Sequence, residues 1–449
     1  MRDNNFLTGM NARHLWHPMA HPGEMQANPP KIIIGADGVS ITDLEGHTTI
    51  DAVGGLWNVN LGYSCQPIKD AIAAQLMRLP YYSAFKGTTN DAAIELSVRL
   101  AGMFGPDGMT RAFFTSGGSD SVDTALKLAR QYHRLRGEAS RTKFIALRKG
   151  YHGTHWGGAS VNGNPAFREP YEPLLPGCFH VPAPYAYRNP FDESDPERLA
   201  ALCLSALEAE IEMQVPSTVA AFIMEPVLGA GGVIAPHPSF MPGVRDICDR
   251  HGVLLIADEV ITGFGRTGDV SGARHWGVKP DLMCLAKAMT SGYFPMGAVM
   301  ANDRLAEVFE GDGGAMIGTG YTYSGHPVGC AAALACLDET ERLTLWDKAA
   351  YQGARLKAGL QDLATRHDAI GDVRGEGLMC ALEIVSDRQA KTMDPARAGR
   401  IFEATYKAGA MVRWSGTNLV MSPPLILTDP DCNRILSALD EGLGAVGAA

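Results

Sequence analysis

Two charged residues stand at the ends of successive apolar runs in the second half of the chain. Val253–Ala257 is followed by Asp258, and Leu282–Ala286 is followed by Lys287. Such short apolar runs predict buried strands of a parallel sheet, whose carboxyl ends open into a cleft. An amine there can form a Schiff base with an aldehyde, and a carboxylate can keep a pyridine nitrogen protonated. The pair therefore suggests a site for pyridoxal phosphate.

The surroundings of Lys287 favour a reactive amine over a solvated one. The segment that follows it, AMTSGYFPMGAV, is rich in glycine and small residues, which would let a bulky ring approach the backbone. Burial would lower the pKa of the ammonium group and favour the free base that attacks a carbonyl.

Two other kinds of binding site have similar residue patterns. An apolar run ending in Asp-Glu resembles the magnesium-binding strand of P-loop ATPases, but the chain contains no Gly-Lys-Ser or Gly-Lys-Thr to complete the GxxxxGK[ST] loop. Gly263, Gly265 and Gly268 match the GxGxxG of a dinucleotide site, with Asp281 as its ribose acid. The long helix that this site needs is not predicted, because DVSGARHWGVKP adds two glycines and a proline. Arg266 within this segment fits an anchored loop better.

A phosphate group needs free N–H groups at the start of a helix, and FFTSGGSDSVDTALKLARQYHRL offers such a start. The predicted strand Arg111–Thr115 leads into Ser116–Ser119, after which Val122, Ala125, Leu126 and Ala129 recur at helical spacing. Ser119 can cap this helix or donate its hydroxyl to a phosphate oxygen. Asp120 and Asp123 favour the positive helix end, but they must point away from a phosphate. An ordinary capped helix would show the same pattern.

A probable loop, KGYHGTHWGGAS, surrounds aromatic and imidazole groups with glycines. The ring of Tyr151 could cover one face of a flat cofactor. His152 and His155 have HxxH spacing, but no Cys, Asp or Glu lies nearby in the loop to complete a metal site. We therefore expect no metal.

The elements around these motifs predict an α/β fold. Residues 1–60 show turn and hairpin patterns, whereas from about residue 70 to 321 helical segments alternate with short apolar strands, as in βαβ units. The expected strands are Arg111–Thr115, Lys143–Leu147, Val219–Met224, Val253–Ala257, Leu282–Ala286 and Met296–Met300. A long helical run from about residue 328 to 367 and a strand-and-helix region follow. We expect an N-terminal arm with part of a small domain (1–60), a large cofactor-binding domain (61–327) and a C-terminal small domain (328–449).

The composition of the chain favours small molecules as its binding partners. The 449 residues carry a formal net charge of −10, and no Lys/Arg cluster suggests a nucleic-acid surface. The N-terminus has no apolar signal segment and no run approaches the roughly 20 apolar residues that span a bilayer, so no membrane association is expected and a cytoplasmic location is predicted. Nine cysteines without a CxxC pair suit reduced, packed thiols.

Taken in order, the motifs resemble the class III pyridoxal phosphate aminotransferases of fold type I over nearly the whole chain. They are SGGSDSVDTALK, GYHG, IMEPVLGAGG, DEVITGFGRTG, the lysine at 287 and YTYSGHPVG. The resemblance implies pyridoxal 5′-phosphate as cofactor. It also implies a large domain with a mostly parallel seven-stranded sheet and a smaller α+β domain built from both termini.

The resemblance assigns roles to the residues around the ring. It makes Lys287 the Schiff-base lysine and Asp258 the partner of the pyridine nitrogen. Val260 would pack on the ring face opposite Tyr151, and His152 beside Tyr151 is counted among the cofactor-binding residues.

Further positions follow from the same family pattern. Gly118 and Ser119 match the phosphate-binding turn, and Glu225 matches a glutamate beneath the cofactor. Thr322 matches a threonine that reaches the phosphate from the neighbouring subunit, which implies a homodimer that could pair further into a tetramer.

Departures from the wider family indicate a branch. Where many relatives have DEVQ, this chain has Ile261, which resembles the ω-amino acid:pyruvate branch. The usual GSEA of the phosphate turn is here Gly118–Ser121, so the contacts of Asp120 and Ser121 are left open.

The same branch supplies expectations for the substrate pocket. Trp57 and Phe85 resemble its aromatic walls, together with Tyr151 and with Tyr321 from the partner chain. Arg413 is similar to the arginine that binds the substrate carboxylate, a role suited to a planar guanidinium.

The expected function is a ping-pong Schiff-base transamination from an ω-amino acid or primary amine to pyruvate, which yields alanine. Donors left open are β-alanine, taurine, a γ-amino acid, a polyamine and an arylalkylamine. The alternatives are a 2-oxoglutarate-dependent aminotransferase, a decarboxylase or aminomutase of the same fold, and a catalytically silent binding protein.

Overall fold

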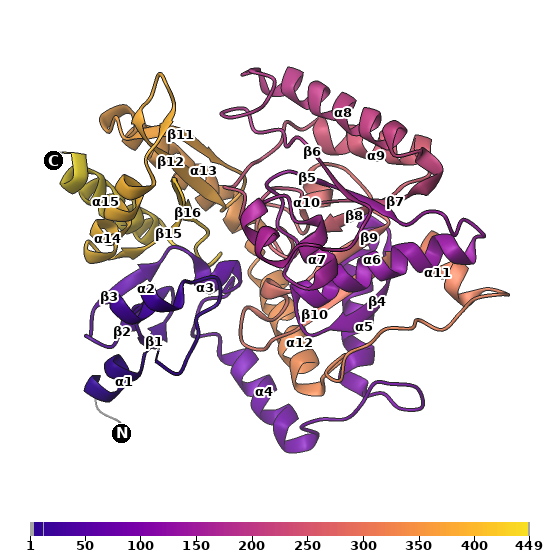
Figure 1. Ribbon diagram of the computed structural model, residues 1–449. Coiled ribbons are helices and arrows are strands. Elements are labelled where there is room, and N and C mark those ends of the chain that lie inside the picture. The colour runs from indigo at the N-terminus through magenta and orange to yellow at the C-terminus, as the bar shows by residue number, and fades with distance from the viewer. Residues whose placement is uncertain (1–3, 12, 448–449) are drawn as a thin grey trace.

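A computed structural model describes residues 4–11 and 13–447 and shows two lobes. The large lobe holds the central part of the chain, and the smaller lobe combines both ends (Figure 1). No helix within these residues is long and apolar enough to cross a membrane. The cytoplasmic location stays a prediction.

A seven-stranded sheet forms the centre of the large lobe, with the order β4-β10-β9-β8-β7-β5-β6. The strands are β4 (Met109–Thr115), β5 (Lys143–Leu147), β6 (Cys178–Val181), β7 (Val219–Met224), β8 (Leu254–Asp258), β9 (Leu282–Leu285) and β10 (Gly297–Asn302). Every neighbouring pair is parallel except those that involve β10, which runs antiparallel to both β4 and β9. The predicted fold class, an α/β fold with a mostly parallel seven-stranded sheet, is confirmed.

Apolar side chains cover both faces of this sheet. On one face, Phe144, Ile223 and Ile256 pack against α6. On the other, Phe222 and Leu255 join a second cluster. Because both faces are buried, the strands are continuous apolar runs, which made them visible in the sequence. Strand β6 was not predicted, since it lies at the sheet edge and its four residues are mostly half-buried.

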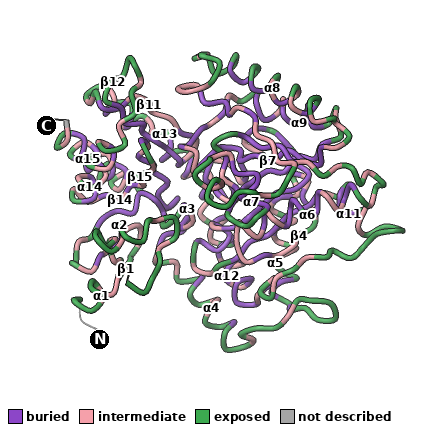
Figure 2. The backbone as a smooth tube through the Cα atoms, in the orientation of Figure 1, coloured by how far each residue is buried: buried purple, intermediate pink, exposed green. Residues whose placement is uncertain are grey.

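Helices pack around the sheet and extend beyond it. Those of the large lobe are α4 (Gln66–Arg78), α5 (Asp91–Phe104), α6 (Gly118–Leu135), α7 (Trp156–Val161), α8 (Pro196–Met213), α9 (Phe240–His251), α10 (Gly272–His275), α11 (Asp303–Glu310) and α12 (Pro327–Arg342). Helix α6 packs on β9 and β10, and α5 packs on β4. Figure 2 shows the centre of this lobe buried and much of α4 exposed.

The small lobe contains two further sheets. One has the order β1-β2-β3-β14 and the other β11-β12-β16-β15, with β13 paired to β12. Their strands are β1 (Ile33–Asp37), β2 (Ser40–Asp43), β3 (Thr48–Asp51), β11 (Ile370–Gly375), β12 (Cys380–Asp387), β13 (Thr392–Met393), β14 (Ala410–Met411), β15 (Arg413–Ser415) and β16 (Asn418–Met421). The helices are α1 (Asn4–Met10), α2 (Pro22–Ala27), α3 (Gly54–Trp57), α13 (Leu345–Arg366), α14 (Pro395–Lys407) and α15 (Asp429–Gly447). The pairing of β14 with β3 joins the two ends of the chain in one sheet.

The long helical run expected from residue 328 to 367 is two helices. Helix α12 ends at Arg342 and α13 begins at Leu345, with Thr344 between them in the left-handed region at φ 43°. Helix α12 packs against α4 and α5 of the large lobe, whereas α13 packs against β11 of the small lobe. The domain boundaries stay a prediction.

Candidate active site

The carboxylate and the lysine predicted to act together line one cavity. Asp258 is the last residue of β8, and Lys287 follows β9 on the neighbouring parallel strand. The cavity is lined by Leu56, Gly118, Ser119, Val122, Tyr151, His152, Gly153, Glu225, Asp258, Val260, Ile261 and Lys287. All eight cofactor-binding residues expected from a single chain are thus brought together.

The surroundings of the Lys287 amine favour its free base more than water does. Burial lowers its pKa to about 8, against the opposing effect of the nearby Asp258 and Glu225 carboxylates. Its backbone lies in the left-handed region at φ 47°, an uncommon conformation for a residue with a side chain. Such a conformation costs energy and persists where packing enforces it, which is frequent at functional sites.

The Asp258 carboxylate is oriented by two groups of the same chain. Nδ1 of His152 lies 2.8 Å from its Oδ2, and the N–H of Val260 donates to Oδ1 over 3.2 Å. The buried Nε2 of His152 has no partner among the described residues. A proton on Nε2 would therefore be unsatisfied, so the ring donates its Nδ1–H to Asp258.

Glu225 acts on the site through the backbone of neighbouring loops. Its two oxygens accept hydrogen bonds from Tyr151 N–H at 2.9 Å and Gly229 N–H at 2.8 Å. Burial raises the pKa of this carboxyl to about 7, with His152 lowering it and Asp258 raising it. Glu225 thereby fixes the loop that carries Tyr151 over the cavity.

The start of α6 is open to an anion. The N–H groups of Gly117, Gly118 and Ser119 have no hydrogen-bond partner in the described part of the chain. A Cβ atom at Gly118 would lie 2.9 Å from Val260, so only glycine lets these two segments approach. Free N–H groups at a helix start bind phosphate, and this end of α6 fits the phosphate of pyridoxal 5′-phosphate.

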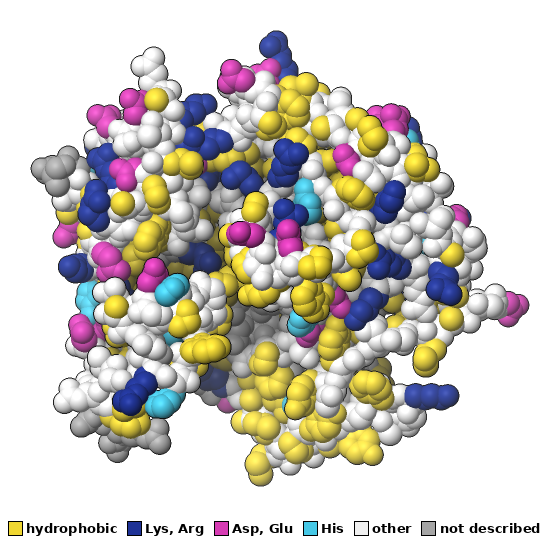
Figure 3. All heavy atoms as spheres, in the orientation of Figure 1, with side chains coloured by type: hydrophobic (Ala, Val, Ile, Leu, Met, Phe, Trp, Pro, Cys, Tyr) yellow, Lys and Arg dark blue, Asp and Glu magenta, His cyan; other side chains and the backbone are white. Residues whose placement is uncertain are grey.

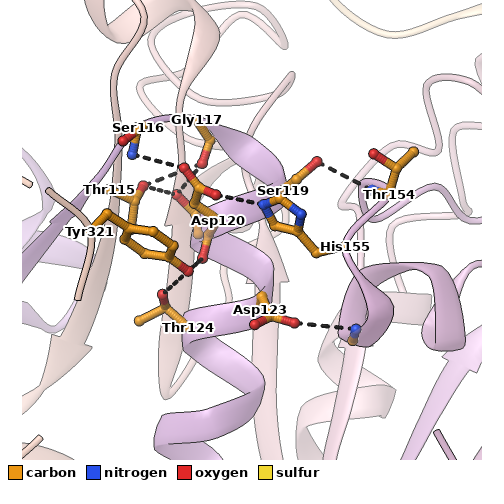
Figure 4. A network of polar contacts seen from close by, with 12 residues as sticks. Thr115, Ser116, Gly117, Ser119, Asp120, Asp123, Thr124, Thr154, His155 and Tyr321 are labelled. Atoms are coloured by element: carbon orange, nitrogen blue, oxygen red, sulfur yellow. Dashed lines mark hydrogen bonds and ion pairs between the residues drawn. The ribbon is translucent and has the colours of Figure 1, made fainter. Parts of the chain in front are cut away.

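The acids at this helix start are turned toward other groups. Figure 4 shows Asp120 directed at Ser116 N–H and His155, and Asp123 directed at the start of α7. The contacts of Ser121 were left open by the sequence. Its hydroxyl is hydrogen-bonded to the hydroxyl of Thr115 and donates to the carbonyl of Leu285. The two histidines of the HxxH pair contact different carboxylates.

Of the expected substrate residues, only Tyr151 is among the described residues that line the cavity. Trp57 is buried at its edge, since a Cβ at Gly229 would lie 2.5 Å from its ring and 2.7 Å from Ile261. Leu56, which was not predicted, lines the cavity and is 57% exposed. It is carried by a kinked segment with positive φ at Gly55 and Trp57, a feature that sequence periodicity does not reveal.

Arg413 presents a free guanidinium on strand β15. Within the residues that the structure describes, no hydrogen bond or ion pair reaches it. Burial lowers the pKa of the Arg413 guanidinium and the facing Tyr151 raises it, and Arg413 in turn lowers the pKa of Lys287. The charge is therefore near the reactive amine without a partner of its own.

Three expected residues are separate from the cavity of their own chain. Phe85 and Thr322 are exposed. The hydroxyl of Tyr321 lies 3.1 Å from both the carbonyl oxygen of Asp120 and Oγ1 of Thr124, on the flank of α6. The contribution of Tyr321 and Thr322 to a neighbouring subunit stays a prediction, as does the role of Phe85 in the substrate pocket.

The GFGRTG segment, considered as a dinucleotide turn, instead connects the lobes. The buried Arg266 donates to the carbonyls of Leu378 and Pro423 in the small lobe and to Oδ1 of Asn60. Asp281 is engaged with Arg245 and Arg304, so it is occupied as a structural acid.

Comparisons with known proteins agree with this geometry. A family model described as aminotransferase class III matches residues 23–443. The structure of an amine transaminase from an uncultivated Pseudomonas species, in its PLP-bound form, is 47% identical, covers 97% of this chain and 99% of that chain, and has a TM-score of 0.94. The putrescine–pyruvate aminotransferase of Pseudomonas aeruginosa is 35% identical over 97% of this chain and 95% of its own length. The diaminobutyrate–2-oxoglutarate transaminase of Halomonas elongata is 37% identical over 93% and 91%.

Proposed function

Since this chain belongs to the class III aminotransferases, which use pyridoxal 5′-phosphate, we propose that it transfers an amino group from an ω-amino acid or primary amine to pyruvate, giving alanine. The omega-transaminase likeness of its relatives supports the donor class. Their acceptors differ, since the printed names include both pyruvate and 2-oxoglutarate enzymes. The choice of pyruvate therefore has to rest on the site.

The unpaired guanidinium of Arg413 carries the proposal. A planar cation near Lys287, without a partner in its own chain, suits a substrate carboxylate held by paired hydrogen bonds. Among the described residues that line the cavity, Lys287 is the one cation, and Leu56 and Ile261 add apolar walls. A second carboxylate, as in 2-oxoglutarate, would have no cation there, whereas the methyl group of pyruvate fits apolar walls.

The residues of the chain divide the chemistry between them. The bound cofactor supplies an aldehyde that condenses with amines and a ring that accepts electrons. The Lys287 amine, with its pKa lowered to about 8 by burial, would take a proton from the donor carbon and deliver it to C4′ of the cofactor. Asp258, held by His152, keeps the proton on the ring nitrogen. Tyr151 and Val260 restrict the ring from its two faces.

We also propose that two copies form the working unit. Large apolar side chains lie exposed on and after α4, on α5 and in the segment before α12: Leu76, Met77, Tyr82, Phe85, Ile94, Val98, Met316 and Tyr323. Figure 3 shows hydrophobic side chains gathered at the foot of the molecule, where α4 and α5 lie. An exposed patch of this kind is typical of a subunit interface. The same surface carries Thr322, which a second copy would need at its phosphate.

A donor panel tests the proposal. Purified protein is supplied with β-alanine, taurine, a γ-amino acid, putrescine or an arylalkylamine, first with pyruvate and then with 2-oxoglutarate. We expect alanine from pyruvate with at least one donor and far slower glutamate formation. Faster turnover with 2-oxoglutarate for every donor would overturn the acceptor assignment.

A further inference from the structure

An unusual carboxylate stands beside the free N–H groups of α6. Asp120 is the third residue of that helix, within one turn of Gly118 and Ser119. A carboxylate at this position can itself accept the N–H groups of a helix start, and it repels another anion placed there. Left free, Asp120 would therefore compete with the cofactor phosphate.

Two contacts occupy this carboxylate, so that it does not bind the N–H groups of Gly117–Ser119. Its Oδ2 accepts the N–H of Ser116 at 3.1 Å, and its Oδ1 lies 2.6 Å from Nε2 of His155 (Figure 4). The Asp120 side chain is 15% exposed and that of His155 is 49% exposed. The imidazole thus covers a carboxylate that is largely withdrawn from water.

His155 belongs to the loop that covers the cavity. Between Tyr151 and His155, the N–H of Thr154 donates to Oγ of Ser119 at 3.2 Å, and a Cβ at Gly153 would lie 2.5 Å from that same oxygen. The loop is thus seated directly on the phosphate turn. The contact of His155 with the Asp120 carboxylate adds a hydrogen bond to this seat.

The neighbouring acid on α6 is engaged differently. Asp123 pairs with Lys127 at 2.8 Å and accepts the N–H of Gly157 at 3.2 Å. Its charge is already matched on its own helix, one turn further from the helix start. Asp123 is therefore a control for removing an acid from α6 without disturbing His155.

We propose that Asp120 and His155 form a positioning pair for the cofactor phosphate. The imidazole hydrogen-bonds the carboxylate, keeps it turned away from the N–H groups of Gly117–Ser119 and holds the Tyr151 loop on the phosphate turn. This inference rests on pyridoxal 5′-phosphate binding at that turn, and is independent of which donor and acceptor react.

Equilibrium binding to the full-length protein freed of cofactor tests the pair. The probes are pyridoxal 5′-phosphate and pyridoxal, which lacks the phosphate, and binding is followed by absorbance and tryptophan fluorescence. For His155→Ala, we expect the Kd of pyridoxal 5′-phosphate to rise about tenfold, because an unmatched acid then faces the phosphate. The Kd of pyridoxal should change less than about twofold, because it offers no charge to that acid.

A second substitution distinguishes an effect of the Asp120 charge from a general loosening of the loop that carries Tyr151. Asp120→Asn keeps an oxygen for Ser116 N–H but removes the charge, so in the His155→Ala background it should restore most of the lost affinity. Asp123→Asn should leave both Kd values within about twofold of wild type, since its charge is matched locally. If His155→Ala fails to fold, His155→Gln replaces it, with a smaller loss and the same restoration expected.

Several outcomes would overturn the proposed role of Asp120 and His155. An equal loss for both probes would mean that the loop is loosened as a whole, and an unchanged Kd would mean that His155 has no effect on the phosphate. If Asp120→Asn does not restore the affinity of His155→Ala for pyridoxal 5′-phosphate, the loss is not caused by the charge of Asp120. Because no turnover is measured, a donor panel that fails leaves this result intact.

Discussion

The two sides of the active site are built in different ways. Around Asp258 and Lys287, the groups that line the cavity come from one chain, and the buried Asp258 and Glu225 carboxylates have hydrogen-bond partners within it. Thr322, which is expected to act from a neighbouring subunit, and Phe85, which is expected at the substrate pocket, lie exposed on the surface of the same chain. The residues proposed for the chemistry thus come from one chain, whereas we propose that substrate fit and part of the phosphate contact depend on a second copy.

Replacement of Lys287 should have the largest effect on the chemistry. Lys287→Ala should lower turnover by at least about 10³-fold, because the group that attacks and moves the proton is lost. Borohydride reduction followed by peptide mapping should find no cofactor on the variant. A reduced adduct on another lysine would show that the amine was assigned to the wrong residue.

Asp258→Asn should leave the cofactor bound but slow the half-reaction with donor by about 10²- to 10³-fold, because a neutral amide no longer holds the ring proton. Stopped-flow absorbance with excess donor measures this rate. Equal rates in wild type and variant would show that Asp258 does not help the ring to accept electrons.

Arg413→Ala should affect only substrates that carry a carboxylate. We expect the KM for pyruvate to rise by about 10- to 100-fold, the loss for a charged hydrogen-bonded pair. The half-reaction with an arylalkylamine should stay within about twofold of wild type, which makes that donor the control. A parallel loss for the amine would indicate a structural role for Arg413.

Disruption of the exposed side should have the mildest effect on the chemistry. Met77→Asp places a charge on the apolar α4 surface and should raise the dimer Kd by about tenfold or more, measured by sedimentation. Met213→Asp is the matched control, because Met213 on α8 is 77% exposed and Met77 is 89% exposed. Similar dimer constants for both variants would place the interface elsewhere.

The residues predicted best were those next to regular elements. Asp258 and Lys287 could be found because fully buried parallel strands are short apolar runs, so the first charged residue after each run marks the cleft. Gly118 and Ser119 were found because a helical repeat follows them. Strand β6 and Leu56 were missed, since an edge strand and a kinked loop leave no such pattern.

Contacts between distant segments could not be predicted from spacing. His152 and Asp258 are 106 positions apart, and His155 and Asp120 are 35 apart. In the sequence, the two histidines formed one HxxH pair; in the fold, each serves a different carboxylate. Which acid each imidazole meets depends on how the loop folds over α6.

From the residue pattern alone, the α/β fold and a candidate pyridoxal phosphate site could be predicted, because a lysine, a carboxylate and a helix start are short motifs at the ends of regular elements. The groups that orient them, and the groups left free, could be identified only in the folded chain. Arg413 without a partner, Asp120 turned onto His155 and Thr322 outside its own cavity are consequences of how segments far apart in the chain are arranged. Orientation depends on contacts between segments far apart in the chain, and local residue patterns do not encode these contacts.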